Sequence, residues 1–153
     1  MIEPKFDRAD VANALNKAID ALQARTVATL QYVGEVCINE ARDSGSYTDR
    51  TGNLRSSIGY VIAKDGTIIT ESAFPRVMGT ADKGPETGRE LAERIARECE
   101  PGSYALVVVA GMKYAVHVTN RGYNVLNSAE LIARQLAPEM LLKLNENRDA
   151  DTK

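Results

Sequence analysis

The chain has 153 residues, 44% of them hydrophobic, and its 19 basic and 21 acidic side chains leave a formal net charge of −2. That length fits one domain with a sizeable core, and the balanced charge argues against a dedicated nucleic-acid binder, which usually carries a marked basic excess. Residues 1–10 lack the apolar segment of a secretory signal, and no window reaches the roughly 18 apolar residues that a membrane span needs. We therefore expect a protein that is made in the cytoplasm and has no membrane partner.

The first predicted element is a long helix that ends near Asp43. Apolar residues recur at steps of three and four from Val11 to Ala41, and the side chain of Asp7 or Asp10 is suited to cap the start of the helix. About 35 residues at roughly 1.5 Å each make a helix of about 50 Å, which is longer than a compact domain of this size is wide.

Two interpretations of this length stay open. The helix can bend around the core, or part of its apolar stripe can be left for another subunit. On the second interpretation, the candidate interface residues are Leu22, Leu30 and Val33 of the helix, together with Arg76 from a later loop.

Residues 57–74 are predicted to form a β-hairpin. Ile58, Tyr60 and Ile62 recur at every second position, and Asp65-Gly66 is a strong two-residue turn signal. Residues 75–88 contain three glycines and two prolines, so they are predicted to form a loop. A loop of that length is often functional or lies at an interface.

The next predicted helix covers residues 89–99. Thr87 and Glu90 have the spacing of a capping box. The spacing of its apolar residues places Leu91, Ile95 and Cys99 on the buried face.

Residues 104–126 contain the most apolar segment of the chain. The valine-rich run Ala105 to Ala110 predicts a strand that is buried on both faces and lies at the centre of the sheet. Gly111 is expected to let this strand bend, so that Tyr114 packs back over the sheet.

The last predicted helix runs from Asn127 to about Asn147. Asn127 and Glu130 have capping-box spacing, and Pro138 is expected to kink or split the helix. Residues 148–153 are predicted to be a disordered tail after a single domain over residues 1–147. The elements together predict an α+β fold, in which a small, mostly antiparallel sheet is packed by the long N-terminal helix, the middle helix and the C-terminal helix.

The sequence contains no recognisable catalytic or metal-binding motif. His117 is the only histidine, and neither a nucleophile motif nor zinc-ligand spacing accompanies it. Cys37 and Cys99 are far apart and are interpreted as reduced, buried hydrophobic residues. Because phosphate-binding, nucleophile-elbow and dinucleotide patterns are also missing, we expect neither enzymatic activity nor a cofactor nor a metal.

Charged loop residues leave two weaker possibilities. The acidic ones are more simply solvated than paired for acid–base catalysis, and they are Asp49, Glu71, Asp82 and Glu86. The basic ones could line a surface beside a phosphate backbone, although exposure to solvent or pairing with acids is more common, and they are Arg50, Arg55, Arg76, Lys83 and Arg89.

Two short segments carry a family resemblance. Residues 50–58 read RTGNLRSSI, and the positions that make up the motif are Arg50, Thr51, Gly52, Leu54 and Ile58. Residues 107–115 read VVVAGMKYA and contain Gly111 and Tyr114, and residues 122–126, GYNVL, begin at Gly122. In this order, over about residues 7–144, the segments and the predicted elements resemble the head–tail joining and tail-component proteins of long-tailed bacteriophages, including tail-completion proteins of prophages.

The resemblance implies a structural virion protein that joins or completes the tail at the head–tail junction as a homo-oligomeric ring. Its expected partners are further copies of itself and other neck or tail proteins, with at most nonspecific contact to passing DNA. Its expected location is the host bacterial cytoplasm during assembly and the virion afterwards. In that family the position of Thr119 is commonly glutamate, so a contact between subunits that depends on this carboxylate would be missing here. The resemblance implies no catalytic residues.

Two alternatives come from other classes of function. The chain could be a non-catalytic binding or regulatory module that grips a partner with the 75–88 loop. It could also be a small enzyme that uses loop carboxylates such as Asp49 and Glu71, which is the least supported because nucleophile, base and cofactor motifs are missing.

Overall fold

The computed structural model describes residues 5–150 and confirms the predicted α+β fold, with five helices and a three-stranded antiparallel sheet among these residues. The elements are α1 (Arg8–Asp43), α2 (Asn53–Ser56), β1 (Ile58–Lys64), β2 (Thr67–Glu71), α3 (Gly84–Ala96), β3 (Tyr104–Ala110), α4 (Ala115–Asn120) and α5 (Asn127–Ala150). Of the expected disordered tail, residues 148–150 belong to α5 and residues 151–153 lie outside the described part of the chain. No helix in the described residues is long and apolar enough to cross a membrane.

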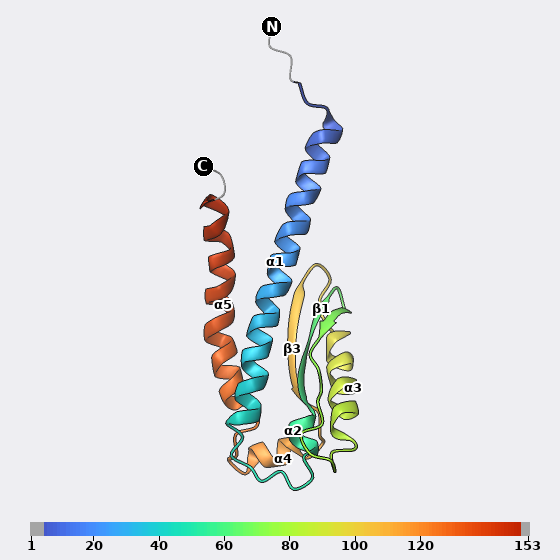
Figure 1. Cartoon of the computed structure of the whole chain (residues 1–153), viewed down its shortest axis with the longest axis vertical. Coiled ribbons are helices and arrows are strands. Elements are labelled where there is room, and N and C mark those ends of the chain that lie inside the picture. The colour runs from blue at the N-terminus through green and yellow to red at the C-terminus, as the bar shows by residue number, and fades with distance from the viewer. Residues whose placement is uncertain (1–4, 151–153) are drawn as a thin grey trace.

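Helices cover both faces of the sheet (Figure 1). The helix α1 lies over one face with α5 beside it, and α3 covers the other face. On the α1 side, Ile58, Tyr60 and Ile62 of β1 pack in one cluster with Val33 and Cys37. On the α3 side, a second cluster is built from Val61, Ala63, Phe74, Ala92, Ala96 and Val109.

The centre of the sheet is β1, because the strand order is β2-β1-β3. The predicted central position of the run Ala105–Ala110 is therefore wrong: β3 is an edge strand in which only Val109 is fully buried. By contrast, β1 is buried on both faces from Ile58 to Ala63. Its α3 face is made partly of small residues, and Gly59 leaves the space that the ring of Phe74 fills. A face built from small residues does not look apolar in the sequence, which is why β1 was missed as the buried strand.

The hairpin of β1 and β2 is confirmed, and its turn lies where the sequence predicts it. Asp65 has φ 54° and Gly66 has φ 77°. Positive φ at both central residues is typical of the tight turns that match the twist of a hairpin.

The helix α3 differs from its prediction at both its start and its buried face. It begins at Gly84 and not at Arg89, so Thr87 lies inside the helix and its hydroxyl donates to the carbonyl of Lys83 at 2.8 Å. Its buried residues are small and recur every fourth position, namely Gly84, Gly88, Ala92 and Ala96. The predicted burial is wrong for Ile95, which is 39% exposed, whereas Leu91 and Cys99 are partly buried at the edge of the second cluster. The small side chains let α3 approach β1 closely and leave the larger ones at the rim of the contact.

The chain after β3 does not return over the sheet as expected. The strand ends at Ala110, and Gly111 lies so close to the backbone of Gly88 in α3 that a Cβ atom would overlap it. Tyr114 precedes the short helix α4 and is 38% exposed. Close packing against α3, and not a bend in the strand, accounts for this glycine.

The helix α1 starts and ends where its pattern predicts. The backbone N–H of Asp7 donates to Asp10, and the Asp7 carboxylate accepts from the N–H of Arg8 at 2.6 Å. Its buried residues begin only at Thr29, and every described residue from 5 to 22 is exposed. Figure 1 shows this first half of α1 extending past the sheet. The length of the helix is therefore accommodated by projection and not by wrapping around the core.

The helix α5 runs through Pro138 as one helix, so Pro138 does not split it. Its first turn is capped from outside, since the side chain of Asn124 accepts from the N–H of Ser128 at 3.2 Å. The expected cap at Asn127 is the first helical residue.

Candidate functional site

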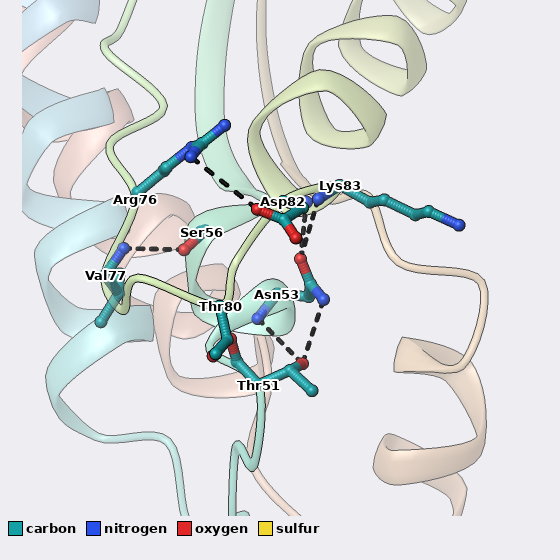
Figure 2. A network of polar contacts seen from close by, with 9 residues as sticks. Thr51, Asn53, Ser56, Arg76, Val77, Thr80, Asp82 and Lys83 are labelled. Carbon is teal, nitrogen blue, oxygen red and sulfur yellow. Dashed lines mark hydrogen bonds and ion pairs between the residues drawn. The ribbon is translucent and has the colours of Figure 1, made fainter.

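The segment 51–56 holds the loop before α3 in place through hydrogen bonds (Figure 2). The Asn53 side-chain oxygen accepts from the backbone N–H groups of Lys83 and Gly84 at 3.1 and 2.9 Å, and its amide nitrogen donates to the hydroxyl of Thr51 at 3.1 Å. Since the side chain of Lys83, the residue that precedes α3, makes no capping hydrogen bond, Asn53 caps α3 from a distant part of the chain.

Two further contacts fix the loop against the same segment. Thr80 donates from its hydroxyl to the carbonyl of Thr51 at 2.9 Å, and the N–H of Val77 donates to the hydroxyl of Ser56 at 2.8 Å. The part of the predicted 75–88 loop that stays outside α3 is therefore tied to the segment at several points. It presents Val77 and Met78 to solvent, with exposed fractions of 44% and 45%.

Gly52 is required by both backbone and packing. Its φ is +74°, a conformation that other residues rarely adopt, and a Cβ atom there would lie 2.7 Å from the Cβ of Met78. The apolar motif residues Leu54 and Ile58 are buried in the core. The first family segment is thus the junction between the core and the loop, and Arg50 and Thr51 are its exposed members.

The second family segment meets the first around a surface hollow of about 470 Å³, which Tyr47, Asp49, Thr51 and Tyr114 help to line. Asp49 accepts the backbone N–H of Arg55 at 2.8 Å, and the guanidinium of Arg55 lies 5.6 Å from the centre of the Tyr47 ring. Burial raises the pKa of Tyr47, which the nearby guanidinium opposes, and burial also raises the pKa of Tyr114. Asp49 is the only carboxylate in the lining, so the hollow offers hydrogen-bonding groups to a partner and no carboxylate pair.

The remaining candidate residues lie in different places. Gly122, with φ 87°, makes the turn after α4, and His117 is an exposed residue of α4. Cys37 is buried, and its burial raises the pKa of the thiol, whereas Cys99 is only half-buried, so the expected burial holds fully for Cys37 alone. Among the described residues, no group of three or more histidine, cysteine, aspartate or glutamate side chains could hold a metal ion.

Several of the charged loop residues have partners within the chain. The guanidinium of Arg76 lies 3.8 Å from the carboxylate of Asp82, and the guanidinium of Arg89 lies 3.5 Å from the carboxylate of Glu71. Arg89 also packs over the ring of Phe74. These are exposed or half-exposed ion pairs, which contribute little to stability. Two of the basic loop residues and two of the acidic ones therefore form ion pairs with each other.

The four candidate interface residues are not brought together. Leu30 and Val33 are buried in the core, between α1 and the sheet. Leu22, by contrast, lies on the projecting half of α1 and is 41% exposed. Arg76 lies on the loop before α3. The exposed apolar residues that continue from Leu22 towards the N-terminus are Val11, Leu15 and Ile19, with exposed fractions of 52%, 60% and 43%. The sequence showed these residues as part of one apolar stripe. It could not show the position at which α1 ceases to pack against the rest of the protein.

No protein-family model, curated protein or solved structure matches this chain. The resemblance to tail components therefore stays a prediction from the two sequence segments.

Proposed function

We propose that this protein is a structural component of a phage or prophage particle that joins or completes the tail by assembling with copies of itself into a ring. The proposal combines the two family segments with one structural observation. That observation is the projecting half of α1, where every described residue from 5 to 22 is exposed, the apolar ones included.

The stripe has a defined face. Successive helix residues turn by about 100° around the axis, so Val11, Leu15 and Leu22 lie on one side of α1, and Lys17 and Asp20 lie on the opposite side. A helix of about 15 residues is marginal in water without tertiary packing. An amphipathic helix that projects from the body is therefore suited to packing on another chain.

Magnitudes indicate what kind of assembly this surface supports. Complete burial of an aliphatic side chain contributes about 1.5–3 kcal/mol, and these side chains are already about half covered. Their further burial therefore contributes about 1 kcal/mol each, while association costs at least about 4 kcal/mol. A single contact through the stripe is weak, so a stable assembly needs two neighbours for each subunit or additional contacts with a neck or tail protein.

The solution mass across a concentration series, measured by light scattering after size exclusion, tests the self-association. We expect growth beyond the monomer at high concentration, and we expect Leu15→Gln combined with Leu22→Gln to abolish it. The matched control is Lys17→Gln on the opposite face of the same helix, which should leave the assembly unchanged. Equal loss in both variants would show that helix content, and not the stripe, controls association.

The biological setting has its own test. When the host is induced to release particles, the protein should be found by mass spectrometry in the purified particle fraction, and the genes beside its own should encode portal, capsid and tail-tube proteins. A protein that is found only in the soluble cell fraction would refute the virion assignment while leaving self-association intact.

The second candidate is a non-catalytic binding module. It is favoured by Val77 and Met78, two apolar side chains exposed on a loop that is held in place by Thr51, Asn53 and Ser56. A strict monomer at every concentration, together with an effect of Val77→Ser on capture of a neck protein, would favour this function over ring assembly.

A further inference from the structure

The sheet has two edges, and they differ in character. The edge strand β2 has five residues, a register irregularity opposite Ile62 and Ala63, and the charged residue Glu71 at its end. The edge strand β3 has seven residues, YALVVVA, which carry no charge and pair with β1 in a continuous register. Bulges, short length and charges are the features that keep an edge strand from pairing with another chain. The strand β2 has all three and β3 has none.

The register shows which backbone groups of β3 are free. The N–H of Ser72 donates to the carbonyl of Tyr60 at 2.8 Å, so Tyr60 directs its backbone groups towards the β2 side. Alternate residues of a strand point their backbone groups in opposite directions, and therefore Val61 faces β3. The N–H of Gly111 donates to Ser57, which extends this alternation. The residues of β3 whose N–H and C=O groups point away from β1 are Tyr104, Leu106, Val108 and Ala110.

These outward groups are arranged symmetrically about Val107. If a second copy of β3 runs antiparallel with its Val107 opposite this one, every outward N–H meets an outward C=O. On the α1 side, Tyr104 then lies opposite Ala110 of the second copy and Leu106 opposite Val108 of the second copy, so each large side chain meets a smaller one. The strand carries no charge that would repel its own copy.

Space for added side chains exists beside this edge. A cavity of about 330 Å³ is lined on one side by Leu106 and Val108 and on the other by Ala129 and Ala133 of α5, with Cys37 of α1 also in its wall. The lining is mainly apolar, so the cavity fits aliphatic side chains of a neighbouring strand.

We propose that β3 is a pairing edge for β3 of a second copy of this chain, which joins the two sheets into one antiparallel sheet through a two-fold axis at Val107. The contact is isologous and closes on itself. It is therefore separate from the contact through α1, and it does not depend on the assignment to a phage particle.

Amide hydrogen exchange, read residue by residue by NMR, tests the proposal on a chain that carries Leu15→Gln and Leu22→Gln, which removes the stripe on α1. The inward amides of Ala105, Val107 and Val109 should be protected at every protein concentration. The outward amides of Leu106, Val108 and Ala110 should exchange quickly in dilute solution and become protected as the mass doubles. Fast exchange of the outward amides at the highest concentration, or doubling without their protection, would overturn the proposal.

Proline substitutions provide a matched pair in the same background. Val108→Pro removes only an outward N–H and should weaken dimerisation about tenfold to a hundredfold, because each dimer loses two hydrogen bonds. Val108→Ala is the control for lost side-chain packing and should dimerise more tightly than Val108→Pro. Val107→Pro removes an inward hydrogen bond to β1 and should unfold the sheet. Dimerisation of Val108→Pro at the affinity of Val108→Ala would refute pairing through this edge, and if Val108→Pro fails to fold, the exchange measurement on the unchanged strand still decides.

Discussion

At the scale of single residues, Tyr60 is the clearest case in which burial changes chemistry. Its side chain is only 3% exposed, and its hydroxyl donates to the Glu35 carboxylate at 3.0 Å. Burial, together with the hydrogen bond and charge of Glu35, raises the pKa of Tyr60 to about 12. The charged phenolate is thus disfavoured in the folded protein.

This shift predicts a loss of stability in alkali. A raised pKa in the folded state contributes stability that is complete below pH 10, the ordinary tyrosine value, and is lost as pH rises through about 12. We expect the free energy of unfolding to fall by up to about 3 kcal/mol over that window, and Tyr60→Phe to remove this part of the pH dependence. Urea unfolding at a series of pH values measures both. An identical alkaline decline in Tyr60→Phe would assign the effect to other groups.

At the scale of elements, the start of α3 depends on a residue in α2. The Asn53 side chain accepts from two N–H groups that the helix itself cannot satisfy. We expect Asn53→Ala to lower the free energy of unfolding by about 1–2 kcal/mol and to increase proteolytic cleavage in residues 75–83. Asn16→Ala on the exposed half of α1 is the matched control, and a loss of similar size there would contradict the capping role.

The same long-range cap explains which elements the sequence could predict. The helix α1 follows from a continuous stripe, and the β-hairpin follows from Asp65-Gly66, because both patterns are local. The start of α3 could not be predicted, since its cap lies 30 residues away at Asn53. The central position of β1 was also hidden, because the α3 face of this strand is built partly from small residues: the ring of Phe74 covers Gly59, and Ala63 packs with Ala92 and Ala96 of α3.

For the candidate site, the sequence identified the segment 50–58 but not which residues this segment contacts. Gly52 and Asn53 could be recognised as turn residues, yet their partners Met78, Lys83 and Gly84 come from a segment for which the sequence predicted a loop and no contacts. The interface prediction combined exposed Leu22 with buried Leu30 and Val33. An apolar stripe in the sequence does not show which part of the helix packs against the rest of the protein and which part projects from it.

At the scale of the whole molecule, the projecting half of α1 stands apart from the folded body. Every described residue from 5 to 22 is exposed. We therefore expect deletion of residues 1–22 to change the free energy of unfolding by less than about 0.5 kcal/mol, while it abolishes the association through α1. Urea unfolding and light scattering on the shortened chain check the two halves of this prediction. A large loss of stability would show that the projecting turns contribute to the body after all.

The order in which the ribosome makes this chain adds a consequence of the packing between α1 and α5. Among the described residues these are the first and last elements, and they lie side by side in the folded protein. The N-terminal helix is therefore complete long before the helix that covers Cys37 and its neighbours has been synthesised. During that interval its whole stripe, and not only the projecting half, is open to contact. Neighbouring chains on one messenger RNA would meet before the core of each is complete. Correct assembly and incorrect association during synthesis would therefore both occur through the apolar stripe of α1.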